Sequence, residues 1–219
     1  MSEAALIVGA GSGLSASLAR LLAGEGSNVA VAARSPEKLD GLVRETRGLA
    51  LRCDATDRAQ VEATFDALKG VPDLVVYNAS YRTRGPLIEL DPREVEKTLS
   101  ISAYAGFLVA QAAAKRMLPR GSGAIFFTGA SASVKGYAGS APFAMGKFAL
   151  RGLAQSMARE LQPKGIHVAH FVIDGAIGRD TDHTRLDPDE IARNYLHVYR
   201  QQRSAWTWEV ELRPWVERF

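Results

Sequence analysis

Residues 4–15 read Ala4-Ala5-Leu6-Ile7-Val8-Gly9-Ala10-Gly11-Ser12-Gly13-Leu14-Ser15. The apolar run at the start is typical of a strand that is buried on both faces. The glycine-rich turn leads into small and aliphatic residues, which predict a helix ending near Gly24. Strand, glycine turn and helix in this order favour a dinucleotide site, because glycines let backbone approach a pyrophosphate and free N–H groups at the helix start bind it.

The alternation of strand and helix continues along the chain. Further strands are expected at residues 28–33, 49–53, 73–77, 124–128, 166–173 and 208–212, with helices at 58–69, 94–118, 140–161 and 188–203. This order predicts an α/β fold with a doubly wound parallel sheet of about seven strands flanked by helices. A length of 219 residues suits one such core. We therefore expect residues 1–219 to form a single Rossmann-type domain.

Composition narrows the classes of function. The net charge is only +3, and basic residues are interleaved with acidic ones, which argues against a nucleic-acid partner. Cys53 is the only cysteine, and no run of about 18 apolar residues occurs, so we expect a cytoplasmic protein without a membrane partner. We expect no metal site, because His167 and His170 face opposite sides of one strand and the other histidines lack neighbouring ligands.

The end of the second strand bears on cofactor choice. A carboxylate at this point holds the ribose hydroxyls of NAD in many dinucleotide-binding folds, but Ala33 stands here. Arg34 and Ser35 follow, and both side chains suit the 2′-phosphate of NADP(H). The alternative interpretation of Arg34 is a solvated arginine that precedes a helix. With the glycine turn upstream, the pattern favours NADP(H) over NAD(H).

The chain resembles the short-chain dehydrogenase/reductase family over nearly its whole length, most strongly over residues 4–78 and 123–173. Gly9 and Gly13 fit the family pattern Gly-x-x-x-Gly-x-Gly, with Ser15 in the third place. Asn78-Ala79-Ser80 stands where the family has Asn-Ala-Gly, and Asp54 resembles its acidic residue beside the adenine. The resemblance implies cofactor contacts at Gly9, Ser12, Gly13, Leu14, Arg34, Ser35, Asp54, Ala55, Asn78, Ala79, Lys147 and Gly175.

The catalytic pattern of the family is only partly present. Lys147 matches the lysine of Tyr-x-x-x-Lys, but Phe143 takes the tyrosine position, which identifies a divergent branch. The serine position falls on Ala130 by the usual interval, or on Ser131 after a one-residue loop difference, and the asparagine position falls on Ser102. Because phenylalanine has no ionisable group, the tyrosine's acid/base role is lost, at a cost of about 10²–10⁴-fold in rate.

Two hypotheses about function stay open. The first is an NADP(H)-dependent oxidoreductase of a small carbonyl or alcohol, in which water, Tyr81 or Tyr137 supplies the proton; both tyrosines also suit plain packing roles. The second is a catalytically silent NADP-binding scaffold, sensor or partner subunit. In the family the helices equivalent to 94–118 and 140–161 form subunit contacts, so the resemblance implies a homodimer or homotetramer.

Overall fold

A computed structural model describes residues 2–217, and one parallel sheet runs through them. The sheet has the strand order β3-β2-β1-β4-β5-β6-β7, and every neighbouring pair is parallel. The strands are β1 (Ala4–Val8), β2 (Asn28–Ala33), β3 (Leu49–Arg52), β4 (Leu74–Tyr77), β5 (Gly123–Thr128), β6 (Ile166–Ile173) and β7 (Glu209–Leu212). The prediction of a doubly wound α/β sheet is confirmed.

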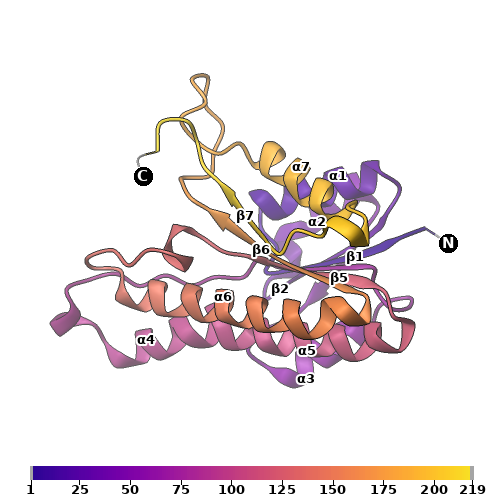
Figure 1. Ribbon diagram of the computed structural model, residues 1–219, viewed down its shortest axis with the longest axis horizontal. Helices are drawn as coiled ribbons and strands as arrows, with labels where there is room; N and C mark the ends of the chain where they lie inside the picture. The colour runs from indigo at the N-terminus through magenta and orange to yellow at the C-terminus, as the bar shows by residue number, and fades with distance from the viewer. Residues whose placement is uncertain (1, 218–219) are drawn as a thin grey trace.

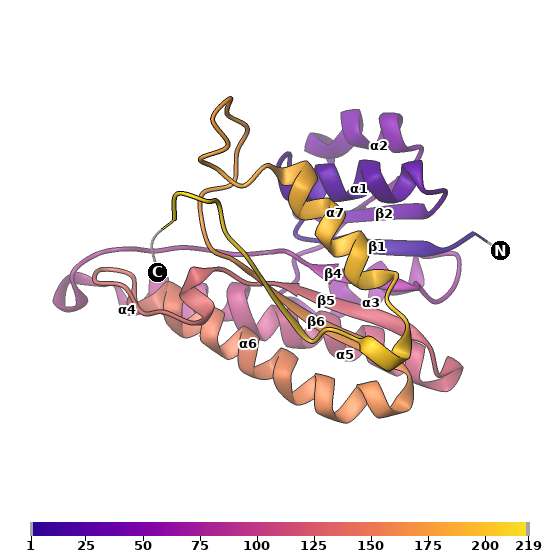
Figure 2. The ribbon, with the colours of Figure 1, turned by 45° about the horizontal axis from the view of Figure 1, so that its top comes forward.

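Helices cover both faces of the sheet, as Figures 1 and 2 show. One face carries α1 (Leu14–Gly24), α2 (Asp40–Thr46) and α7 (Pro188–Tyr199), and the other carries α3 (Arg58–Asp66), α4 (Pro92–Leu99), α5 (Ala105–Met117) and α6 (Ala141–Leu161). Each layer packs its own cluster of buried aliphatic and aromatic side chains against the sheet. None of the helices within residues 2–217 is long and apolar enough to cross a membrane.

The central strands are buried along their whole length, as their apolar runs predict. All four residues of β4 and all eight of β6 are buried. Side chains alternate between the two layers, so His167 stacks on Trp206 while His170 bonds Glu209, which also pairs with Arg151 of α6. The two histidines therefore face opposite sides of the sheet, as predicted.

Two helices differ from their predicted outlines. The helix expected over 94–118 is continuous, but residues Ser100–Tyr104 form a π-helical turn between α4 and α5, which the sequence did not indicate. The helix expected over 188–203 ends at Tyr199. The Gln201 side chain donates to Thr207 Oγ1 and accepts from the Thr207 N–H, both at 2.9 Å, and these bonds fold the chain into the approach to β7.

Candidate functional site

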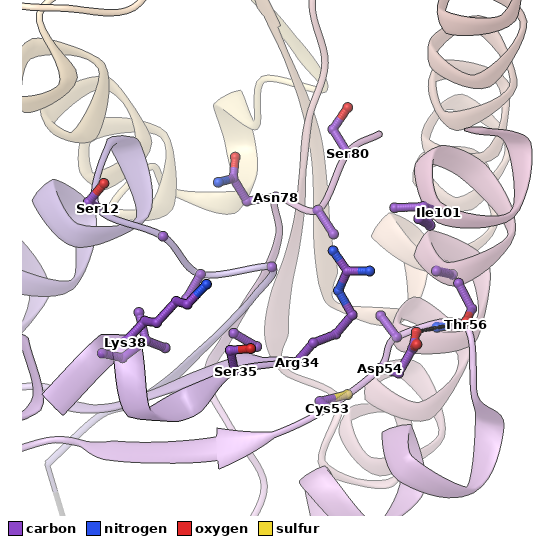
Figure 3. A pocket seen from close by; sticks show the side chains of 18 residues that line it. Ser12, Arg34, Ser35, Lys38, Cys53, Asp54, Thr56, Asn78, Ser80 and Ile101 are labelled. Atoms are coloured by element: carbon purple, nitrogen blue, oxygen red, sulfur yellow. Dashed lines mark hydrogen bonds between the residues drawn. The ribbon is translucent and has the colours of Figure 1, made fainter. Parts of the chain in front are cut away.

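A cavity of about 710 Å³ opens at the carboxyl ends of β1, β2, β3 and β4 (Figure 3). In open α/β sheets ligands bind at this edge, where neighbouring strands send their connections in opposite directions. Here that point lies between β1 and β4. The volume falls in the range of small-molecule and cofactor sites, about 300–1,000 Å³.

The glycine turn forms one wall of this cavity. Gly9 has φ +82°, and a Cβ atom on it would lie 2.3 Å from the Ala79 backbone nitrogen, so only glycine fits. Cβ atoms on Gly11 and Gly13 would meet nothing within 4 Å, and no side chain caps the start of α1. The turn therefore leaves open space and free N–H groups beside the cavity, which fits a pyrophosphate.

Ser15, at the third position of the glycine pattern, is accommodated by a hydrogen bond. Its side chain is 2 % exposed, and its Oγ accepts from the Asn78 side-chain amide at 2.7 Å. This bond joins the first turn of α1 to the end of β4. The serine therefore fixes Asn78 at the cavity wall instead of holding the helix away from the sheet.

Basic side chains gather at the β2 side of the cavity. Arg34 extends into it, and Lys38, from the 3₁₀ helix Pro36–Leu39, lies on the same wall together with Ser35 (Figure 3). Neither the Arg34 guanidinium nor the Lys38 ammonium forms an ion pair within residues 2–217. Lys38 was missed from sequence, although a second basic residue four positions after Arg34 is a usable signal.

Asp54 lies on the opposite wall, where its carboxylate is held by the next turn of chain. Its Oδ1 accepts from the Thr56 N–H at 3.0 Å and from the Thr56 hydroxyl at 2.7 Å. Its backbone N–H donates to Gln60 at 2.9 Å. Asp57, and not Asp54, caps the start of α3, because its side chain accepts from the N–H groups of Ala59 and Gln60.

Lys147 belongs to α6, and its side chain reaches the same edge of the sheet at the end of β5. Its side chain is 2 % exposed, and its Nζ donates to the Thr128 carbonyl at the end of β5, at 2.8 Å. Burial, with a smaller contribution from the Arg82 cation, lowers the pKa of Lys147 to about 8. An ammonium with one neutral acceptor keeps two N–H groups for a ligand.

Phe143 packs one helical turn before Lys147 and is buried. The Arg82 guanidinium lies over its ring, with Cζ 4.1 Å from the ring centroid, and Lys147 Nζ is 5.9 Å from the same centroid. The ring has no proton to give or take. The sequence did not indicate a role for Arg82. The structure places it beside Phe143 and Lys147, two of the residues predicted to be catalytic.

The two predicted catalytic serines have different surroundings. Ser102 is fully buried in the π-helical turn, and its hydroxyl bonds both the N–H and the carbonyl of Tyr81 at 3.3 Å. Ser131 begins the 3₁₀ helix Ser131–Ser133 and is half-buried, and its hydroxyl makes no hydrogen bond within residues 2–217. Ala130 donates its N–H to Ser133 Oγ at 3.1 Å. Both serine roles stay predictions.

Both alternative proton sources are placed by the structure. The Tyr81 hydroxyl donates to Glu94 at 2.5 Å and accepts from Lys97 at 3.1 Å, so it is already engaged. Tyr137 is 48 % exposed in the loop before α6.

The cavity brings together most of the predicted cofactor residues. Those that line it are Gly9, Ser12, Arg34, Ser35, Asp54, Ala55, Asn78 and Ala79. Gly13 and Leu14 lie behind the wall at the start of α1, while Lys147 and Gly175 follow β5 and β6 outside the lining. Within the described residues no group of three or more His, Cys, Asp or Glu is placed to hold a metal ion.

Comparison with known proteins gives consistent matches. The family model for short chain dehydrogenase matches residues 3–187. L-xylulose reductase from Bos taurus is 35% identical over 167 residues, which cover 75% of this chain and 68% of that protein. The crystal structure of a short-chain dehydrogenase from Rhodopseudomonas palustris superimposes with a TM-score of 0.87 at 38% identity, covering 97% of this chain and 99% of that one.

A third comparison concerns the fold alone. A variant of actinorhodin polyketide ketoreductase, solved with NADPH, superimposes with a TM-score of 0.90 at 23% identity, covering 97% of this chain and 96% of that one. The arrangement of strands and helices is therefore shared with that protein.

We predict that the lowered pKa of Lys147 makes the free energy of unfolding depend on pH. The unfolded lysine keeps its proton up to about pH 10.5, whereas the folded one loses it near pH 8, so this group makes stability rise with pH between those values, by about 3 kcal/mol in total. Lys147→Met lacks this contribution. Its stability relative to wild type, measured by urea unfolding, should therefore fall steadily from pH 7 to pH 10.

Lys115→Met, at an exposed lysine of α5, is the matched control for loss of one positive charge. A difference between Lys147→Met and wild type that stays constant over this pH range contradicts the lowered pKa.

Proposed function

The chain belongs to the short-chain dehydrogenase family of NAD(P)-dependent oxidoreductases, and we propose that it uses NADP(H) to reduce a small carbonyl or oxidise the corresponding alcohol at an atypical site. The observation that carries this proposal is the cavity beside the Gly9 turn, with Lys147 at the same sheet edge. In this proposal Phe143 stands at the position of the family's tyrosine and Lys147 at that of its lysine.

The preference for NADP(H) rests on the charge of the cavity wall. Ala33 offers no carboxylate to ribose hydroxyls, whereas Arg34, Ser35 and Lys38 present two cations and a hydroxyl. A 2′-phosphate pairs well with such a group by charge-assisted hydrogen bonds. The Arg34 backbone is held in place because its carbonyl accepts from the Arg52 side chain at 2.9 Å.

In the proposed reaction the cofactor, bound NADPH, supplies the hydride, and the side chains of the protein bind and orient the reactants. Lys147, fixed on the Thr128 carbonyl, keeps two N–H groups for a ribose hydroxyl or a substrate oxygen, and with a pKa of about 8 it is mostly charged at neutral pH. Phe143 has no ionisable group and transfers no proton. Solvent then supplies the proton, and we expect slow turnover compared with a site that holds a positioned acid.

A second candidate function is favoured by Phe143 itself. A catalytically silent protein that binds NADP(H) as a scaffold, sensor or partner subunit needs the nucleotide cavity but no acid. The engagement of the Ser102 hydroxyl with Tyr81 also fits this candidate, because that hydroxyl is occupied in the fold. The carbonyl reductase activity of the Phe143→Tyr variant distinguishes the oxidoreductase from the silent NADP(H)-binding protein.

We also propose self-association as a homodimer or homotetramer through residues 94–118 and 140–161. Large apolar side chains are exposed along these helices, namely Tyr104, Phe107, Met145 and Phe148. Monomeric proteins rarely leave such a stripe in water. The proposed molecule is a single-domain cytoplasmic protein whose other partner is a small-molecule substrate, with no role in binding nucleic acid or membranes.

We predict that Arg34→Ala weakens NADPH binding by about tenfold to a hundredfold and leaves NADH binding nearly unchanged, because the guanidinium addresses only the 2′-phosphate. Isothermal titration calorimetry with both nucleotides measures this. Arg44→Ala, at an exposed arginine of α2, is the matched control and should bind both as wild type does. Equal affinity of wild type for NADPH and NADH would refute the NADP(H) preference.

We predict that Phe143→Tyr raises carbonyl reductase activity by about 10²-fold or more, because it places an ionisable hydroxyl near the Lys147 cation. NADPH oxidation with a panel of aldehydes and ketones is the assay. Leu49→Tyr adds the same hydroxyl at an exposed residue at the amino end of β3, away from the site and from both helices, and should change nothing. No gain in a Phe143→Tyr protein that still binds NADPH decides for the silent candidate.

We predict that the 23.6-kDa chain sediments as a dimer or tetramer at micromolar concentration. Paired substitutions Met145→Glu and Phe148→Glu should shift it to the monomer, because they place charges in the apolar stripe. Ile177→Glu is the control, since this exposed apolar residue lies outside both helices. A wild-type mass of one subunit in analytical ultracentrifugation rules out the assembly.

A further inference from the structure

Two cations lie beside the Phe143 ring, and a third follows two residues along the same loop. Arg82 Cζ is 4.1 Å and Lys147 Nζ 5.9 Å from the ring centroid. Arg84 follows Arg82 in the chain, and its charge adds to burial in lowering the pKa of Arg82. We name Arg82, Arg84 and Lys147 the cation cluster. Its members come from the chain after β4 and from the helix after β5, so it lies at the same edge of the sheet as the nucleotide cavity.

The cation cluster has no counter-ion in the fold. Within residues 2–217, neither Arg82 nor Arg84 makes a hydrogen bond or ion pair, and Lys147 bonds only the neutral Thr128 carbonyl. The charges oppose each other, because Arg82 adds to burial in lowering the pKa of Lys147. An anion at this place relieves both the repulsion and the cost of burying the ammonium.

The position of Arg82 is set by contacts on both sides of it. Before it, the Tyr81 backbone is held by the buried Ser102 hydroxyl, and the Tyr81 phenol donates to Glu94 at 2.5 Å. After it, the Gly85 N–H donates to the Gly139 carbonyl at 3.0 Å. The arginines therefore lie on a segment that is fastened at both ends, and fixing a binding group beforehand lowers the entropic cost of using it.

Arg82 is also separate from the cations of the nucleotide cavity. Arg34 and Lys38 line that cavity, whereas Arg82 and Arg84 do not. Arg82 and Lys147 instead lie beside Phe143, which in the proposed function stands at the position of the family's active-site tyrosine. This location assigns the cation cluster to the substrate rather than to the 2′-phosphate.

Resting on the proposed function, we propose that the cation cluster binds an anionic group of the substrate, a carboxylate or a phosphate, close to the carbonyl that is reduced. The guanidinium of Arg82 presents paired N–H groups that match either anion. The substrates are then oxo acids or phosphorylated carbonyl compounds rather than neutral aldehydes and ketones. Phe143 acts in this site as the surface on which Arg82 rests.

The test uses the protein without cofactor and follows Lys147 directly. Lysine labelled with ¹³C at Cε is titrated by NMR with and without oxalate, and Lys147→Met assigns the signal. Oxalate should raise the pKa of Lys147 from about 8 to about 9, because an opposite charge favours the ammonium. Inorganic phosphate in place of oxalate tells which anion is preferred, and the readout at Lys147 separates this from binding at Arg34.

Substitutions at Arg82 test whether this residue binds the anion that shifts the pKa of Lys147. Arg82→Gln should raise the pKa of Lys147 in the absence of any anion and weaken oxalate binding about tenfold or more, while Arg82→Lys should retain part of the affinity. Arg159→Gln, at an exposed arginine of α6, should behave as wild type does. No response of Lys147 to either anion, or an Arg82→Gln response equal to that of wild type, overturns the proposal.

The outcomes also separate this proposal from the proposed function. If NADPH does not bind but oxalate still shifts Lys147, the oxidoreductase proposal fails and the anion site stands. If NADPH binds and an oxo acid is reduced no faster than its neutral methyl ester, the anion site fails and the oxidoreductase proposal stands. A preference of about tenfold in kcat/KM for the acid, lost in Arg82→Gln, supports both.

Discussion

The close contact between the first turn and the end of β4 governs the whole candidate site. A Cβ on Gly9 would lie 2.3 Å from the Ala79 backbone nitrogen, so the two segments touch without any side chain between them. The bond between Ser15, in the first turn of α1, and Asn78 fastens the same pair of segments. The wall of the cavity, the Asn78 amide and the start of the loop that carries Arg82 lie beside this contact.

Around Phe143 and Lys147 the fold carries an electrostatic cost. A buried ammonium with a lone neutral acceptor, near a second cation, is unfavourable in the absence of an anion. Proteins tolerate such arrangements where a ligand completes them. The phenylalanine ring has no proton to donate, and Arg82 lies over it. Around this ring the described residues therefore bring two cations together without an ionisable phenol.

The sequence predicts the sheet and one wall of the site well, and the physical reason is locality. Apolar runs such as Ala4–Val8 and Ile166–Ile173 report double burial directly, and residues just after them lie at one edge because the strands are parallel. Arg34 was found in this way, whereas Asp54 and Asn78 were predicted from the family resemblance. The π-helical turn and the place of Arg82 depend on contacts between Tyr81 and Ser102, 21 residues apart, which no local pattern contains. The choice between Ala130 and Ser131 depends in the same way on loop conformation.

The edges of the sheet have a consequence for how copies of this chain meet. β3 and β7 are the outermost strands, each is only four residues long, and between them they carry Arg52, Glu209 and Glu211. Short, charged edges are poor templates for adding a strand from another molecule. Aggregation by sheet extension is thereby disfavoured, and crowded copies are left with the helical faces as their way to associate.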